Sequence, residues 1–98
     1  MQNRYDKSTE DLCKALLSLQ SKEECLAFLE DICTIKEIQD ISQRLEVAKM
    51  LSQGISYTTI CKETGASTAT ISRIKRCYDY GTGGYKTVIS RLKENNDA

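Results

Sequence analysis

The chain has 98 residues, and its 14 lysine and arginine side chains balance 14 aspartate and glutamate side chains to a formal net charge of zero. This length predicts a single domain over residues 1–98, and the zero net charge excludes a uniformly basic nucleic-acid coat. The charges are unevenly divided. Residues 1–55 hold 7 basic and 10 acidic side chains, net −3, whereas residues 56–98 hold 7 and 4, net +3. A polyanionic partner would therefore meet the C-terminal half.

Histidine is absent, and the five cysteines form no Cys-x-x-Cys pair. We expect no metal site, because zinc sites need a closer set of ligands, and no enzyme, because the commonest general base is missing. The cysteines are predicted to be reduced and mostly buried; they are Cys13, Cys25, Cys33, Cys61 and Cys77. No run approaches the roughly 18 apolar residues of a membrane span, and the N-terminus lacks the apolar core of a signal peptide. We expect a cytoplasmic protein with no membrane partner.

Proline is absent, and no alternation of polar and β-branched residues predicts a strand, so the pattern favours an all-α fold. Two pairs with capping-box spacing, Ser8 with Asp11 and Ser21 with Glu24, each precede apolar residues at helical intervals. They predict helices over residues 9–19 and 22–32.

A longer helix is predicted from Ile35 to Gln53. Thr34 and Glu37 have capping spacing at its start, and Gly54 follows its end, where glycine commonly stops a helix. Its apolar residues form one stripe with a second edge beside it. The stripe consists of Ile35, Ile38, Ile41, Leu45, Ala48 and Leu51, and the second edge of Val47 and Met50. This width exceeds what one neighbouring helix covers, so we expect more than one packing surface.

Two short helices are predicted next, over residues 56–63 and 67–78, with Gly65 in the turn between them. A helix of about seven residues is not stable alone in water, so the first must pack against the second. A glycine-rich loop over residues 79–84 then leads to a last amphipathic helix over residues 85–93.

A short helix, a glycine turn and a second helix that begins with small polar residues are typical of a helix-turn-helix. The second helix enters a major groove about 12 Å wide, so its leading side chains must be short and able to hydrogen-bond or touch a thymine methyl. Those that qualify are Ser67, Thr68, Ala69 and Ser72. Ile60, Ile71 and Ile74 are predicted to point inward and hold the two helices together. We therefore predict binding to double-stranded DNA.

Arg73, Lys75 and Arg76 follow at the far end of the second helix, where cations complement the helix dipole or reach phosphates. Capped helix pairs also occur in domains that never touch DNA. The alternative is therefore a helical protein-interaction module without DNA binding. It would depend on the apolar face of the pair and not on its basic side chains.

Two runs of the sequence, Arg44-Leu-Glu-Val-Ala-Lys-Met-Leu-Ser-Gln-Gly54 and Ile60-Cys-Lys-Glu-Thr-Gly-Ala-Ser-Thr-Ala-Thr-Ile-Ser-Arg73, resemble the tryptophan repressor superfamily. The Tyr-Gly-x-Gly-Gly-Tyr motif from Tyr80 to Tyr85 is similar to that of its short repressor-related proteins. The resemblance implies an all-α fold of about six helices with a helix-turn-helix, built as an intertwined homodimer. Residues 1–54 would be the helical dimerisation part, residues 55–78 the helix-turn-helix, and residues 79–98 the glycine loop and C-terminal helix.

The resemblance also implies a transcriptional repressor that reads a palindromic operator with two recognition helices about 34 Å apart. It assigns base reading to Thr68, Ala69 and Ser72. Basic side chains of the family are replaced in the first helix of the pair, so phosphate contacts are expected elsewhere. The candidates are Lys62, Lys75, Arg76 and Lys86. The glycines of the following loop leave backbone amides free to approach a phosphate, with the Tyr85 hydroxyl beside them; a plain connector is the other interpretation.

In the tryptophan repressor a small-molecule corepressor lies against the recognition helix, and the matching positions here are Thr34, Arg44, Thr70 and Arg73. Two arginines can clamp a carboxylate or sandwich a planar ring. Tryptophan itself is disfavoured, because Ile74 replaces a family glycine and Cys77 a family serine. Another small anion and the absence of any effector are both left open. A helix cap, an ordinary helical position and ion pairs or phosphate contacts would account for the four residues equally well.

Overall fold

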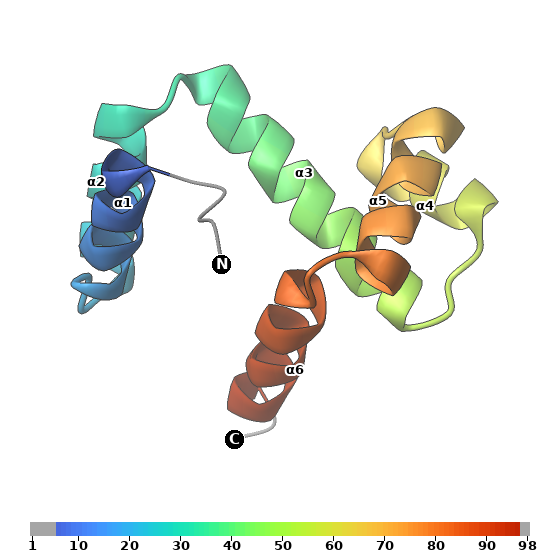
Figure 1. The fold of residues 1–98 in the computed structure, drawn as a ribbon. Helices are drawn as coiled ribbons and strands as arrows, with labels where there is room; N and C mark the ends of the chain where they lie inside the picture. Colours follow the sequence, from blue (N-terminus) through green and yellow to red (C-terminus); the bar gives the residue numbers. More distant parts are fainter. Residues whose placement is uncertain (1–5, 97–98) are drawn as a thin grey trace. The chain divides into compact units, whose positions relative to one another are not determined.

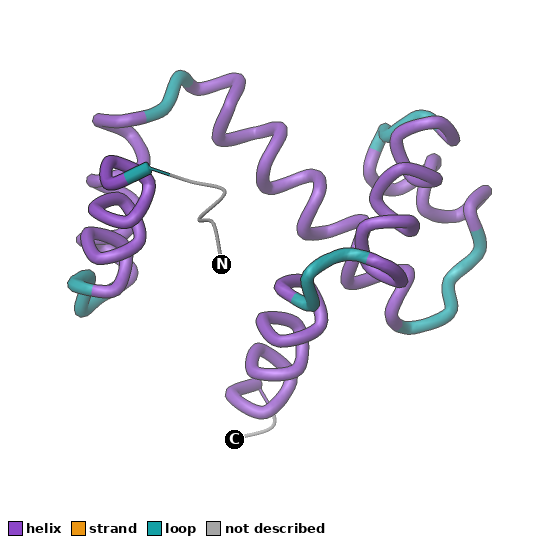
Figure 2. Tube along the Cα trace, in the orientation of Figure 1, coloured by secondary structure: helices purple, strands orange, loops and turns teal. Residues whose placement is uncertain are grey.

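The computed structural model describes residues 6–96, and these residues form six α-helices without a strand (Figure 1). The helices are α1 (Lys7–Leu17), α2 (Lys22–Ile32), α3 (Ile35–Ser52), α4 (Tyr57–Thr64), α5 (Thr68–Tyr80) and α6 (Gly84–Asn96). Short loops connect them (Figure 2). The all-α prediction is confirmed. The chain divides between Ile38 and Gln39 into two compact units, which are described one at a time; the single domain and its three predicted parts stay predictions.

The first helix begins earlier than predicted. Asp6, and not Ser8, is the N-cap of α1: its Oδ1 accepts hydrogen bonds from the Thr9 amide at 3.1 Å and from the Ser8 hydroxyl at 2.8 Å. The predicted cap was wrong because a carboxylate two residues upstream satisfies the free amides first. The helix also ends at Leu17 and not at Leu19, where the Ser18 hydroxyl donates to the Ala15 carbonyl at 2.7 Å.

The second helix begins where predicted. The Ser21 hydroxyl accepts from the Glu24 amide at 3.0 Å, and the Glu24 carboxylate accepts from the Gln20 amide at 3.0 Å. Neither α1 nor α2 contains a buried residue. Several of their large apolar side chains are exposed, among them Leu17 at 85% and Leu26 at 51%. Within one chain the first unit therefore leaves its apolar faces uncovered.

The predicted caps of α3 are both confirmed. Thr34 and Glu37 form a reciprocal capping box: the Glu37 amide donates to Thr34 Oγ1 at 3.1 Å, and the Thr34 amide donates to Glu37 Oε1 at 2.9 Å. At the other end Gly54 has φ +78°. Its amide donates to the Leu51 carbonyl and the Ile55 amide to the Met50 carbonyl, the paired bonds of a Schellman motif.

The core lies in the second unit and joins α3, α4, α5 and α6. It consists of Val47, Ala48, Met50, Ile60, Ala66, Ile71, Ile74 and Ile89. The expected main stripe of α3 is only partly correct, because its buried face is centred on Val47 and Met50. The first half of that stripe remains uncovered, with Ile35 exposed at 76% and Ile41 at 49%.

The expectation that the cysteines are mostly buried was wrong. Cys13 and Cys77 are exposed, and Cys25, Cys33 and Cys61 are half-buried, all as free thiols. Two of the half-buried thiols, Cys25 and Cys33, belong to the unit that has no buried residue among its described positions, so no core is available to them. Within residues 6–96, no helix is long and apolar enough to cross a membrane.

The last helix is longer than predicted at both ends. It begins at Gly84 and continues to Asn96, whereas the apolar pattern predicted residues 85–93. Gly83 precedes it with φ +90°, a conformation that favours glycine. Polar residues after Lys93 extend the helix, and Glu94 and Asn95 are exposed, so hydrophobic spacing alone did not indicate this extension. Asp97 and Ala98, part of the predicted C-terminal segment, lie outside the described residues.

Candidate nucleic-acid interface

Helices α4 and α5 pack against each other around a sharp turn (Figure 1). The Ser56 hydroxyl accepts from the Thr59 amide at 3.3 Å and begins α4, which ends at Gly65 with φ +77°. Ile60 and Ile71 are fully buried between the two helices and Ile74 is 4% exposed, as predicted. The pair is therefore held by buried side chains, and its outer face is left to solvent.

The turn is fixed from α3 by a hydrogen-bond network that sequence reasoning missed. Gln43 Nε2 donates to the Thr64 carbonyl at 3.1 Å. The Thr64 hydroxyl donates to the Ile60 carbonyl at 2.7 Å and accepts from the Ala66 amide at 3.1 Å. These contacts satisfy backbone groups at the end of α4, where a helix leaves its carbonyls unpaired. Gln43 thus ties α3 to the turn that sets the direction of α5.

The three side chains predicted to read bases, Thr68, Ala69 and Ser72, are all exposed on α5. Ser67, the fourth candidate, is also exposed, but its hydroxyl is engaged in hydrogen bonds with Thr70. Its hydroxyl oxygen accepts from the Thr70 amide at 3.1 Å, and the same hydroxyl donates to Thr70 Oγ1 at 3.0 Å. Ser67 is therefore the N-cap of α5, which places the three exposed side chains on the first two turns of the helix.

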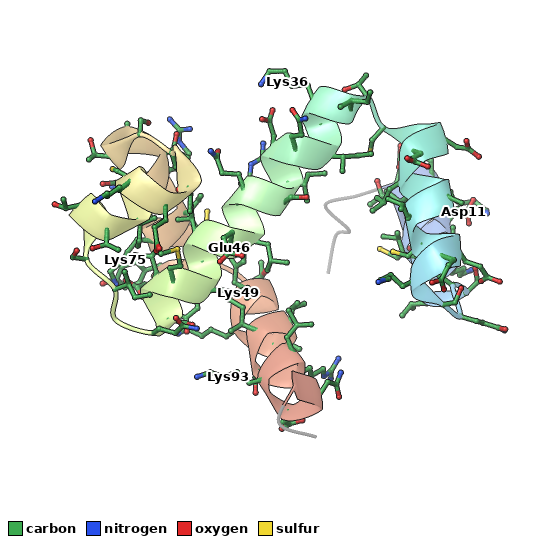
Figure 3. The ribbon with its side chains drawn as sticks, turned by 180° about the vertical axis from the view of Figure 1, so that it is seen from behind. Asp11, Lys36, Glu46, Lys49, Lys75 and Lys93 are labelled. Carbon is green, nitrogen blue, oxygen red and sulfur yellow. The ribbon has the colours of Figure 1, made fainter. Side chains whose placement is uncertain are left out.

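The predicted phosphate-binding cations differ in their surroundings. Lys62 and Arg76 are exposed, and neither has an ion-pair partner among residues 6–96. Lys86 Nζ lies 5.4 Å from the centre of the Tyr78 ring, a cation–π contact. Lys75 (Figure 3) instead forms an ion pair with Asp79, Nζ to Oδ2 at 2.7 Å. The hydrogen bond that Lys75 donates to the Asp79 carboxylate raises the pKa of Lys75, since it favours the charged ammonium.

Three of the four predicted ligand residues share one cavity of about 290 Å³. Arg44 comes from α3, and Thr70 and Arg73 come from α5; the other lining residues are Ile74, Cys77 and Tyr85. Arg73, which was also predicted to contact DNA, therefore lies on the cavity side of α5. Thr34 does not line this cavity; it belongs to the first unit and its hydroxyl caps α3.

Tyr85 lies between this cavity and a larger, mainly apolar one of about 610 Å³ that it also lines. Burial raises the pKa of Tyr85, and Cys77 adds to the effect while Arg44 opposes it. The larger cavity is lined by apolar side chains of α3 and α6, including Ile41, Leu45 and Val88. Its wall includes Gly81, where a Cβ would lie 2.4 Å from the Cys77 carbonyl oxygen, so only glycine fits.

A four-helix core that supports an exposed second helix after a glycine turn defines this protein as a member of the helix-turn-helix class. Comparison with known proteins gives the family. The Trp repressor protein family matches residues 7–93, and the chain belongs to it. This family is one of DNA-binding regulators and not of enzymes.

Similar proteins occur in several bacteria. The uncharacterized protein YerC of Bacillus subtilis (strain 168) is 53% identical over 88 residues, which cover 90% of this chain and 85% of that protein. The crystal structure of a proposed Trp repressor from Staphylococcus aureus has a TM-score of 0.87 at 47% identity and covers 91% of this chain and 89% of its own. A TrpR-like protein from Eubacterium eligens also has a TM-score of 0.87, at 50% identity, covering 90% and 91%. The similarity to the family predicted from the sequence is confirmed.

Proposed function

We propose that this protein is a sequence-specific DNA-binding repressor of transcription that places α5 in the major groove. One observation carries the proposal: Thr68, Ala69 and Ser72 stand exposed on a helix whose opposite side is fixed by the buried Ile71 and Ile74. Short side chains let the helix approach base edges, and a rigidly held helix keeps the approach reproducible. A regulator of this kind acts where the DNA is, so the cytoplasm is its proposed location.

Phosphate contacts would surround these base-reading residues. Arg76 and Lys62 are the first candidates, because both are exposed and neither is held in an ion pair with a described residue. Lys86 is a further candidate from α6, where its contact with the Tyr78 ring leaves the ammonium charge intact. Ser67 would support the interface as a cap, and Arg73 would have to share its guanidinium between the cavity and the DNA.

We further propose that the protein acts as a homodimer. The first unit exposes a set of large apolar side chains, which includes Leu12, Leu16, Leu17, Leu26 and Ile32. Burying apolar surface stabilises association by about 25 cal/mol per Å², and a second copy would cover these faces. Two-fold symmetry would then repeat α5 and favour a palindromic operator with half-sites about 34 Å apart.

The smaller cavity supports a site for a small-molecule effector. Two guanidinium groups, from Arg44 and Arg73, and the Thr70 hydroxyl are suited to a carboxylate or another small anion. Ile74 and Cys77 line the same space, which disfavours tryptophan as the ligand. Because Arg73 lies on the recognition helix, an anion bound there would touch the element that approaches DNA.

The decisive experiment is selection of genomic DNA fragments by the purified protein, repeated with a panel of amino acids and other small carboxylates. We expect enrichment of a palindromic site. Arg76→Ala should then reduce the slope of log affinity against log salt by about 0.9, the value of one phosphate contact. Absence of binding at low salt, or binding without preference for any site, would contradict the proposal.

The second candidate function is a protein-interaction module, favoured by the apolar cavity between α3 and α6. A triple variant, Arg73→Ala with Lys75→Ala and Arg76→Ala, separates the two. A regulator loses its effect in cells when these cations are removed, whereas an interaction module retains it. Val88→Asp places a charge in the apolar cavity. This variant should abolish the cellular effect of an interaction module and leave that of a DNA-binding regulator intact.

A further inference from the structure

Lys75 and Asp79 form a close ion pair, with Nζ 2.7 Å from Oδ2, shorter than the pairs of Lys7 with Asp11 at 3.1 Å and of Lys49 with Glu46 at 3.7 Å. Both side chains keep contact with solvent, at 46% and 32% exposure. The pair is therefore formed at the surface of α5, one helical turn apart, where an outside ligand can still reach either group. The DNA backbone is a polyanion that would compete with Asp79 for the same ammonium.

Helix stability does not account for Asp79. Its position in the last turn of α5 places a negative charge near the negative end of the helix dipole, which is unfavourable. The order is also the weaker one, because acid–base pairs four residues apart stabilise helices better when the acid comes first. Surface pairs of this kind contribute little to folding. The pair is better explained by what α5 does than by how it folds.

Lys75 and Asp79 lie on the same stripe of α5 as the base-reading residues. Thr68, Ser72, Lys75 and Asp79 follow one another at intervals of four, three and four residues, which keeps them on one side of an α-helix. A helix that turns Thr68 and Ser72 toward DNA therefore brings the Asp79 carboxylate toward the phosphates as well. Phosphates repel this carboxylate and attract the lysine that it holds.

We propose that Asp79 lowers the affinity of this protein for DNA by occupying Lys75, so that a phosphate contact forms only when the internal ion pair breaks. The inference rests on the proposed DNA binding and assigns Asp79 as a residue that limits affinity. Lys75, a predicted phosphate ligand, then contributes less in the native protein than Arg76, which forms no ion pair with any residue in the range 6–96. Because phosphate contacts contribute equally at every DNA sequence, weaker phosphate binding would make the affinity depend more on the base contacts.

The test is a double-mutant cycle on the full-length protein, measured by fluorescence anisotropy with a labelled mixed-sequence duplex over a series of salt concentrations. Asp79→Asn should tighten binding and steepen the slope of log affinity against log salt by about 0.9. Over a fourfold range of salt concentration, its gain in affinity should then be roughly threefold larger at the lowest salt than at the highest. Lys75→Ala should have a small effect in the native background and a larger one when combined with Asp79→Asn. Thermal unfolding of each variant checks folding, and Asp79→Asn should not lower Tm.

Glu63→Gln is the matched control, because it removes an exposed carboxylate from α4 that is not paired with Lys75. Its effect should be the same with and without Lys75→Ala. If Asp79→Asn behaves like Glu63→Gln and is additive with Lys75→Ala, the affinity-limiting role is overturned. In that case, a smaller slope of log affinity against log salt in Arg76→Ala would still support the proposed DNA binding. If no variant binds the duplex at low salt, the proposed function fails and this inference fails with it.

Discussion

One carboxylate oxygen of Asp6, the residue before the first helix, accepts three hydrogen bonds. Its Oδ1 accepts from the Thr9 amide, the Thr9 hydroxyl and the Ser8 hydroxyl. These donors lower the pKa of Asp6 from its ordinary value of 3.8, with the Ser8 hydroxyl as the largest cause. A single carboxylate thus determines where α1 starts, although the adjacent serine has the more familiar capping spacing.

We predict that acid loosens the start of α1. Because the pKa of Asp6 is lowered by folding, its stabilising effect is complete above the ordinary value of 3.8 and is lost as the pH falls through the folded value. The protection factor of the Thr9 amide, measured by NMR and corrected for the intrinsic pH dependence of exchange, should fall over this range in the native protein. Asp6→Asn retains a capping oxygen that does not titrate, so it should remove the pH dependence; equal behaviour of both proteins would contradict the role of Asp6.

Gly65 is required for its backbone conformation and not for lack of space. A Cβ there would meet nothing within 4 Å, but φ is +77°, which disfavours other residues. Gly65→Ala should therefore lower the free energy of unfolding by about 1 kcal/mol. Gly84→Ala is the control, because that position has no positive φ and the nearest atom to its Cβ is 3.8 Å away. Urea unfolding should show little change for this control; a similar loss in both variants would refute the argument.

At the level of helices, Gln43 joins elements that are far apart in sequence. Loss of its hydrogen bond to the Thr64 carbonyl leaves a half-buried acceptor less well satisfied. Gln43→Ala should lower the free energy of unfolding by about 1 kcal/mol and weaken DNA binding, because the turn before α5 is no longer tied to α3. Gln39→Ala, an exposed change on the same helix, should alter neither quantity. The pair is compared by urea unfolding and by anisotropy, and equal DNA affinity for both would count against positioning by Gln43.

Helix starts in this chain were predictable where a hydroxyl precedes the helix. Ser21, Thr34, Ser56 and Ser67 each accept an amide hydrogen bond three residues later, so local spacing was sufficient. The turn at Gly65 and the inward isoleucines followed from the same local rules. The family resemblance correctly predicted the fold. Of the four pocket residues that it implied, Arg44, Thr70 and Arg73 line one cavity and Thr34 does not, and their role in binding a ligand stays a prediction.

Long-range pairing was not predictable in this way. Nothing near Gln43 in sequence indicates that its amide reaches Thr64, because that contact depends on how α3 crosses the end of α4. The same holds for the buried face of α3, where the predicted second edge of Val47 and Met50 is buried and Ile35 and Ile41 of the predicted main stripe are exposed. The four-residue spacing of Lys75 and Asp79 indicates an ion pair, but only the positive charges of this segment were considered in the sequence, and the pair was not predicted.

At the level of the molecule, the proposed homodimer depends on the uncovered apolar faces of the first unit. Leu26→Asp places a charge on the exposed face of α2 and should convert the dimer to monomers in analytical ultracentrifugation. Lys22→Asp adds a carboxylate to the same helix at an exposed polar position and should leave the assembly unchanged. If both variants sediment like the native protein, this face is not the interface.

Helices α1 and α2 have no buried residue within one chain, so in the proposed homodimer their folding would depend on the concentration of the protein. When two copies must meet before these helices gain an interior, dilution unfolds them, and the melting temperature rises with protein concentration. Occupancy of an operator would then grow with the square of the number of free chains while most chains are single. If the protein is the proposed repressor, a modest change in its synthesis would thereby become a sharper change in the expression of the genes that it regulates.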